Sequence, residues 1–171
     1  MGFEDIVCRN DDERFMLEAM REAELAAGAD EVPVGAVIVK DGEIIARAHN
    51  LVESSSRSAA HAEMLAIEAA ESALGAKWLP ETTLYVTLEP CSMCAGAMVL
   101  ARIPRLVIGT DDPKTGACGS VLNVACNDRL NHRLDISRGV LGEECSEQIR
   151  SYFRKKRDEL KIKNAAGRQQ I

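Results

Sequence analysis

Two short motifs constrain this chain more than any other feature of its sequence. His61 and Glu63 are separated by one residue, and Pro90 precedes a pair of cysteines, Cys91 and Cys94. Zinc favours imidazole nitrogen and thiolate sulfur, and a Cys-x-x-Cys spacing at a helix N-terminus lets both sulfur atoms face one ion. We therefore predict that His61, Cys91 and Cys94 hold a single zinc ion.

Three protein ligands leave one position of a tetrahedral zinc ion open. In catalytic sites that position holds water, whose pKa the metal lowers to about 7. Glu63 is then free to move protons beside the metal as a catalytic acid and base, because it is not needed as a ligand. On an ideal helix Glu63 would point about 200° away from His61, so this prediction requires an irregular first turn.

A structural zinc site is the alternative interpretation, because such sites are usually closed by a fourth protein ligand. Five further side chains are candidates for closing it: Cys118, Cys126, Cys145, His49 and His132. Isolated Cys and His residues without ligand spacing are more often packing residues. We therefore interpret the site as catalytic.

Length and composition indicate one domain over residues 1–171, since 46% hydrophobic residues suffice for a core. The first residues are acidic, and no segment approaches the roughly 20 apolar residues that span a bilayer. Six cysteines in such a chain indicate cytosolic thiols and a metal site, not disulfides. We expect a cytoplasmic protein without a membrane partner.

Charge is segregated along the chain. The net charge is −6, yet residues 150–171 contain eight Lys and Arg against two acidic residues. A basic segment of this kind is typical of contact with a polyanion, although charged C-terminal helices are also commonly just solvated. We predict a basic helix at about 143–163 and a flexible tail over 164–171.

Hydrophobic periodicity predicts alternating helices and strands. Helices are expected over four segments, 11–28, 60–73, 91–101 and the basic segment above. Strands are expected over residues 32–39, 44–48, 83–88 and 106–109, and Asp41-Gly42 predicts a hairpin between the first two. Residues 51–58 and 111–133 are expected to be loops. This alternation predicts an α/β/α layer arrangement.

Further motifs occur in order between about residues 11 and 160: Val32-Pro-Val-Gly-Ala36, His61-Ala-Glu63, Thr87-Leu-Glu-Pro-Cys-Ser-Met-Cys-Ala-Gly-Ala-Met98, Lys114-Thr-Gly-Ala117, Asn131-His-Arg133 and Tyr152-Phe-Arg154. With these motifs the chain resembles the bacterial tRNA adenosine deaminases of the cytidine deaminase superfamily. The resemblance implies a three-layer α/β/α fold with a mixed five-stranded sheet, and a homodimer with one Zn²⁺ per subunit. It also implies a tRNA anticodon arm as the partner, whose wobble adenosine is converted to inosine.

The resemblance carries over six substrate-binding residues. Asn50 and Ala62 match positions at the flipped nucleoside, and Asp112 and Lys114 match a loop along the anticodon. Phe153 and Arg154 match the helix that meets the RNA. The neighbouring sequence alone also allows another interpretation of Asn50 and Asp112. Both lie in predicted turns, where Asn and Asp side chains often form hydrogen bonds with their own backbone.

One difference from the family lies before the zinc helix, where Ser58-Ala59-Ala60 replaces the usual Asp-Pro-Thr-Ala. Two alternative functions remain open. A deaminase acting on a free nucleobase or nucleoside, such as guanine or cytosine, would use the same zinc and Glu63. A non-catalytic zinc or RNA-binding subunit would have no need of a carboxylate beside the metal.

Overall fold

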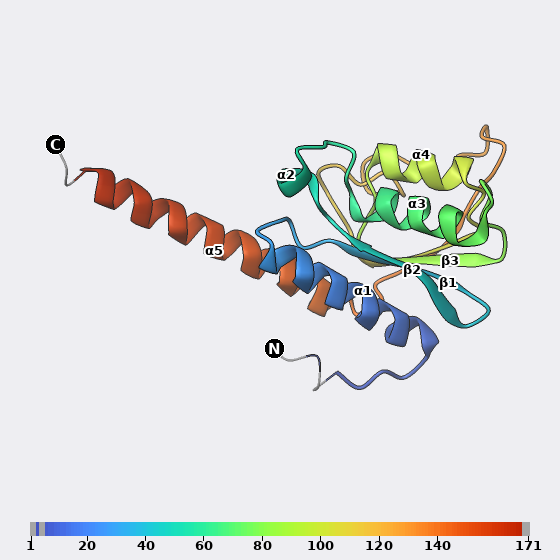
Figure 1. The fold of residues 1–171 in the computed structure, drawn as a ribbon, viewed down its shortest axis with the longest axis horizontal. Coiled ribbons are helices and arrows are strands. Elements are labelled where there is room, and N and C mark those ends of the chain that lie inside the picture. Colours follow the sequence, from blue (N-terminus) through green and yellow to red (C-terminus); the bar gives the residue numbers. More distant parts are fainter. Residues whose placement is uncertain (1–2, 4–5, 169–171) are drawn as a thin grey trace.

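The computed structural model describes residue 3 and residues 6–168 (Figure 1). Five strands form one sheet in the order β2-β1-β3-β4-β5. Their bounds are β1 Gly35–Lys40, β2 Glu43–His49, β3 Thr82–Leu88, β4 Arg105–Thr110 and β5 Asp135–Arg138. β1 runs antiparallel to both of its neighbours, whereas β3, β4 and β5 are parallel. The prediction of a mixed five-stranded sheet is confirmed.

Helices cover both faces of this sheet. Their bounds are α1 Asp11–Gly28, α2 Val52–Ser55, α3 Ala62–Leu74, α4 Ser92–Leu100 and α5 Gly142–Arg168. α1 and α5 pack on one face, and α3 and α4 lie on the other, each face with its own apolar cluster (Figure 1). This confirms the α/β/α layers. None of the described helices combines the length and apolar character that crossing a membrane requires.

The predicted hairpin joins β1 to β2 through a two-residue turn. Lys40 pairs with Glu43, and both turn residues have positive φ, 52° at Asp41 and 78° at Gly42. Asp-Gly suits this turn because two successive positive φ values match the twist of the flanking strands. The hairpin prediction is confirmed.

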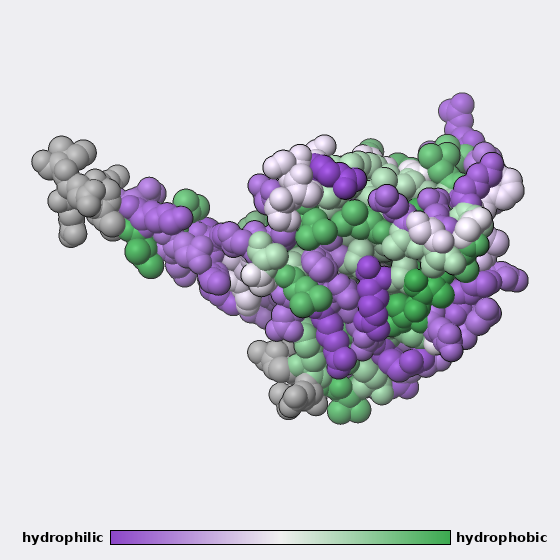
Figure 2. Space-filling model, viewed as in Figure 1, coloured by the Kyte–Doolittle hydropathy of each residue, from purple (hydrophilic) through white to green (hydrophobic). Residues whose placement is uncertain are grey.

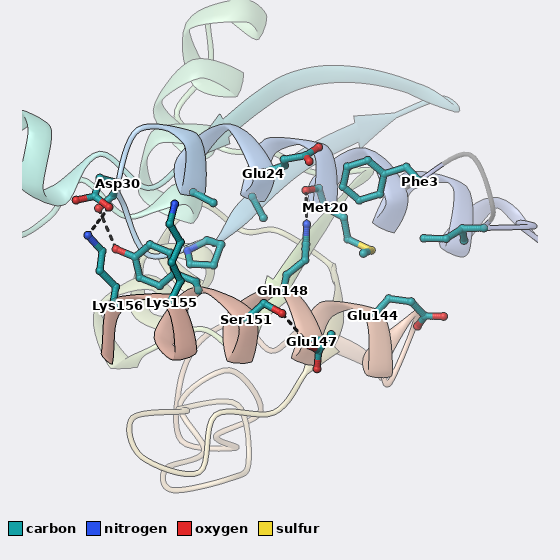
Figure 3. Close-up of a pocket in the computed structure, with 15 residues that line it drawn as sticks. Phe3, Met20, Glu24, Asp30, Glu144, Glu147, Gln148, Ser151, Lys155 and Lys156 are labelled. Carbon is teal, nitrogen blue, oxygen red and sulfur yellow. Dashed lines mark hydrogen bonds and ion pairs between the residues drawn. The ribbon is translucent and has the colours of Figure 1, made fainter. Parts of the chain in front are cut away.

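α5 is anchored along about its first half to α1 and to Asp30, which follows the end of α1, and then leaves the globule. The Gln148 side-chain amide donates to the Met20 carbonyl at 3.0 Å, and the Tyr152 hydroxyl donates to the Asp30 carbonyl at 2.9 Å. Lys156 forms an ion pair with the Asp30 carboxylate (Figure 3). Beyond these contacts the helix projects away from the domain (Figure 1).

Three local features differ from the expectation. Residues 51–58, expected as a loop, contain the single turn α2, and the pattern of hydrophobic residues did not locate β5. α5 continues to Arg168, whereas the helix was expected to end near residue 163. The last residues of the predicted tail, 169–171, lie outside the described residues.

Candidate active site and metal centre

The three predicted ligands come from the starts of two helices that meet at the carboxyl end of β3. His61 is the N-cap of α3 with extended backbone angles, φ −74° and ψ 150°, and Cys91 is the N-cap of α4. Cys94 lies in the first turn of α4. Because His61 precedes the helix instead of belonging to it, Glu63 and His61 reach the same site without the helical separation of about 200°.

The ligand atoms lie at distances that fit a tetrahedral zinc ion. The sulfur atoms of Cys91 and Cys94 are 3.7 Å apart, and the Nδ1 atom of His61 lies 3.7 and 3.5 Å from them. With ordinary Zn–S and Zn–N bond lengths, tetrahedral angles require separations of about 3.8 Å between sulfurs and about 3.6 Å between nitrogen and sulfur. One imidazole and two thiols therefore fit zinc in both chemistry and spacing.

Within the part of the chain that the structure describes, His61, Cys91 and Cys94 form the only group of three or more potential metal-binding side chains. The two histidines considered as a fourth ligand have different partners. His49 pairs with Glu22 at 2.9 Å, and the Nε2 atom of His132 lies 2.7 Å from the Ile103 carbonyl. Among the described residues the group thus has three potential ligands, which is the number typical of catalytic zinc sites.

Glu63 is buried in the first turn of α3, beside Cys94. Burial raises the pKa of its carboxyl to about 7, against the opposing effects of its own backbone N–H and of His61. A buried carboxyl group with a raised pKa is suited to proton transfer, because it can hold a proton as well as accept one.

The two thiols differ in their acidity. The hydrogen bond between the Cys91 and Cys94 side chains lowers the pKa of Cys91 to about 5, and the backbone N–H groups of Cys94 and Met93 add to this effect. The same hydrogen bond, together with burial, raises the pKa of Cys94. Backbone N–H groups at a helix start favour a thiolate, which is the form that binds metal.

His61, Cys91 and Glu63 line a cavity of about 260 Å³. Its volume lies just below the range of about 300–1,000 Å³ that holds drug-sized ligands. This size suits one base. Its walls are formed by Glu31, Val32, Val34, Asn50, Val52, Glu53, His61, Glu63, Leu88, Glu89, Cys91, Asp112 and Thr115.

Four of the predicted substrate-binding residues lie at or beside this cavity. The Asn50 side-chain oxygen accepts the Ala62 N–H at 2.9 Å, which fixes the start of the zinc helix. Asp112 lines the cavity, and its carboxylate caps its own turn by accepting the Lys114 N–H at 2.9 Å and the Thr115 hydroxyl. Lys114 is exposed.

Phe153 and Arg154 lie farther away, on α5. Phe153 is 42% exposed and lines a second cavity of about 540 Å³, which shares Val32 and Glu53 with the metal cavity. The Arg154 guanidinium donates to the carboxylate of Glu147 at 2.7 Å. The two cavities therefore share two wall residues, and the second one extends to Phe153 on α5.

Two buried carboxylates in the cavity wall, Glu31 and Glu89, were not among the predicted site residues. Glu31 accepts the backbone N–H groups of Glu53 and Ser54, and Glu89 accepts those of Asp112, Cys118 and Ser120. Burial opposes ionisation of both, but these hydrogen bonds outweigh it and lower both pKa values. The available signal was an acidic residue beside an apolar strand.

The segment before the zinc helix, Ser58-Ala59-Ala60, is held by backbone hydrogen bonds although its sequence differs from that of the family. Ala60 is buried, its carbonyl accepts the Leu51 N–H at 3.0 Å, and its own N–H donates to the Arg57 carbonyl at 3.0 Å. Ser58-Ala59-Ala60 therefore delivers His61 to the site without a proline.

Residues 10–157 match the family model of the MafB19-like deaminases. The tRNA-specific adenosine deaminase of Bacillus subtilis is 51% identical over 160 residues, which cover 94% of this chain and 97% of that protein. The tRNA-specific adenosine deaminase of Haemophilus influenzae is 44% identical over 155 residues, which cover 90% of each chain.

Solved structures agree with these sequence matches. One from a study of A-to-I editing by tRNA:A34 deaminases at the wobble position superposes with a TM-score of 0.76 at 44% identity, covering 79% of this chain and 98% of that one. A guanine deaminase from Nitrosomonas europaea has a TM-score of 0.70 at 24% identity, covering 86% and 85%, which shows the shared fold alone. The chain therefore belongs to the MafB19-like deaminases and, within them, to the family of the tRNA-specific adenosine deaminases.

Proposed function

We propose that this protein converts adenosine to inosine at the wobble position of a tRNA anticodon, using zinc held by His61, Cys91 and Cys94. The observation that carries the proposal is the open group of three ligands with Glu63 buried beside it, in a chain 51% identical to a tRNA-specific adenosine deaminase. The reaction adds water at carbon 6 of the base and releases ammonia.

Bound zinc supplies Lewis-acid activation of water. The chain's own residues do the rest. Glu63 takes one proton from the attacking water and passes it to the ring nitrogen. It then takes the remaining proton from the hydroxyl added at carbon 6 and gives it to the leaving amine, which departs as ammonia as the carbonyl forms. Its buried position restricts the exchange of this proton with bulk water. The small cavity admits one base that has been unstacked from the RNA, and its apolar walls, Val32 and Leu88, pack on the ring.

The RNA is proposed to follow the surface that joins the two cavities. Asn50 and Ala62 then lie at the nucleoside, Asp112 and Lys114 border the neighbouring anticodon nucleotides, and Phe153 offers a face on which a base can stack. Support comes from the shared wall of the two cavities.

The basic part of α5 is proposed to bind RNA phosphates. Figure 2 shows the projecting part of the helix as largely hydrophilic. Replacing Arg154, Lys155 and Arg157 together by Gln is expected to weaken tRNA binding at least tenfold. Three lost phosphate contacts on a single strand would reduce the slope of log K against log salt by about 2. Binding titrations at several salt concentrations measure both quantities.

The matched control removes the same charge elsewhere. Replacing Arg9, Arg14 and Arg21 by Gln changes the net charge equally at the N-terminal side of the domain and is expected to leave the salt slope unchanged. If both triple variants lose affinity to the same extent, the basic helix has no specific role and only the total charge matters.

A homodimer is proposed through the face formed by α3 and α4. Trp78 is 51% exposed and Leu100 is 74% exposed, and together they border a cavity of about 420 Å³ on this face. An apolar surface with an aromatic anchor is typical of a protein interface, and a second copy is the expected occupant. Leu100→Glu is expected to convert dimer to monomer in sedimentation velocity, whereas Leu25→Glu, at a 57% exposed site on α1, is not. A wild-type protein that sediments as a monomer would contradict the proposal.

The function itself is tested by substrate choice. Zinc-loaded protein is incubated separately with tRNA, with guanine and with cytosine, and the products are separated by chromatography. Inosine is expected in the nucleosides of the tRNA. Deamination of a free base with no change in the tRNA would favour a free-base deaminase, and no product in any incubation would favour a non-catalytic subunit.

A reducing cytoplasm, which keeps the ligand thiols available, is the proposed location.

A further inference from the structure

The carboxylate of Glu89 has no exposed surface, yet it is the most heavily hydrogen-bonded side chain near the active site. Its Oε1 atom accepts the N–H groups of Cys118 at 3.0 Å and Ser120 at 3.1 Å, and lies 3.5 Å from the guanidinium of Arg138. Its Oε2 atom accepts the Asp112 N–H at 3.1 Å and the Ser120 hydroxyl. Every partner lies beyond residue 110.

These donors belong mainly to one segment, residues 111–120, which we call the substrate loop. Little regular structure holds it, because it lies between β4 and β5 and makes only isolated bridges. Three backbone N–H groups of this loop converge on one carboxylate. A loop that is not paired in a β-sheet must satisfy its buried N–H groups with other acceptors. The two carboxylate oxygens of Glu89 are these acceptors.

The loop is also pressed against the metal-binding segment. The Ala117 N–H donates to the Pro90 carbonyl at 2.8 Å, and Cys91 forms a bridge with Gly116. A Cβ atom on Gly116 would lie 2.5 Å from the Glu89 carboxylate, so only glycine permits this close approach. Glu89 thus joins the substrate loop to the segment that carries two metal ligands.

Arg138 contacts both the Glu89 carboxylate and the substrate loop. From the end of β5, its guanidinium pairs with the Asp111 carboxylate at 2.6 Å and also donates to the Cys118 carbonyl. It compensates the buried charge of Glu89, which lowers the cost of enclosing a carboxylate. The loop is therefore held at both of its ends.

We infer that Glu89 is a positioning residue for RNA binding, which fixes the substrate loop so that Asp112 and Thr115 form their side of the active-site cavity. This inference rests on the proposed function, because it assigns the loop to the RNA. Both loop residues line the cavity that contains His61 and Glu63. None of the hydrogen bonds of the Glu89 carboxylate goes to a metal-binding side chain or to Glu63, so we assign it to substrate binding and not to proton transfer.

The test is Glu89→Gln. The amide keeps the shape of the side chain but turns one acceptor into a donor that faces the loop's own donors, so the loop shifts. The KM for a tRNA anticodon stem-loop is expected to rise about tenfold or more, with kcat changed by less than about threefold and one zinc retained per chain. A fall in kcat and zinc content at unchanged KM would overturn the inference, as would unchanged values of both kinetic constants.

Hydrogen exchange gives a readout that does not depend on activity. In Glu89→Gln the amide protons of Cys118 and Ser120 are expected to exchange at least about tenfold faster, whereas that of Ser54 is unchanged. Glu31→Gln is the matched control, because its carboxylate holds Ser54, and it should show the reverse pattern. Slow exchange in the loop of Glu89→Gln would contradict the inference.

A milder variant decides the matter if Glu89→Gln does not fold. Ser120→Ala removes a single hydroxyl donor to the same carboxylate and is expected to raise KM about threefold, with kcat and zinc content unchanged. An unchanged KM would overturn the inference. Failure of the proposed function is recognised separately, because the wild-type protein would then leave the stem-loop unmodified while the exchange experiment still reports on the loop.

Discussion

Glu63→Ala is expected to lose at least about a thousandfold in the rate of adenosine deamination while it keeps one zinc per chain. Glu63 is proposed to carry every proton of the reaction, and proton transfer by a positioned side chain typically contributes about 10² to 10⁴ in rate. Its carboxylate lies beside Cys94 but is not needed to complete the group of three ligands. Single-turnover kinetics on an anticodon stem-loop, together with metal analysis of the same sample, measure both effects.

Two further variants make this result specific. Glu63→Gln keeps the size of the side chain and is expected to be nearly as inactive, because the amide cannot take up a proton. Glu43→Gln removes a carboxylate from an exposed position on β2 and should leave the rate unchanged. Turnover by Glu63→Ala within tenfold of the wild-type rate would contradict its role as the proton carrier.

Replacing a metal ligand is expected to remove the zinc along with the activity. In Cys91→Ala one thiolate of the trio is lost, and the remaining two side chains would hold the metal at least about a hundredfold more weakly, since even groups that only orient ligands cost 10- to 100-fold when they are replaced. Metal analysis after dialysis and the rate on the stem-loop are both expected to fall to background.

Cys126→Ser is the matched control for the ligand variants. The thiol of Cys126 donates to the Leu134 carbonyl at 3.3 Å, and a serine hydroxyl can make the same bond. Zinc content and rate should both stay at the wild-type level. If Cys91→Ala retained its zinc and its activity, the metal would be held by other residues and the assignment of the site would be wrong.

The chemistry of the site could be predicted from sequence because most of its residues lie close together in two short motifs. Cys91 and Cys94 share one helix start, and His61 is separated from Glu63 by one residue. The meeting of the two motifs follows from topology, since α3 and α4 cover the same face of the sheet. The fifth strand and the RNA-contact residues followed only from the resemblance to the deaminase family, because residue spacing alone does not predict them.

Other features had no local signature. β5 is four residues long and largely polar, so it shows no alternation, and α2 is a single turn without a side-chain cap. Glu89 was missed because its donors lie from 23 to 49 residues farther along the chain, and only the folded loop brings them to its carboxylate. A buried acidic residue is recognised by its partners, and these appear only in three dimensions.

Mapping of inosine in tRNA is the decisive experiment for the proposed function. A mixture of unmodified tRNAs is treated with the zinc-loaded wild-type protein or with Glu63→Ala, and adenosine-to-inosine changes are located by sequencing. We expect inosine at the first anticodon position of at least one tRNA with the wild-type protein and none with the variant. Unchanged anticodons after treatment with fully zinc-loaded wild-type protein, or equal editing by both proteins, would contradict this expectation.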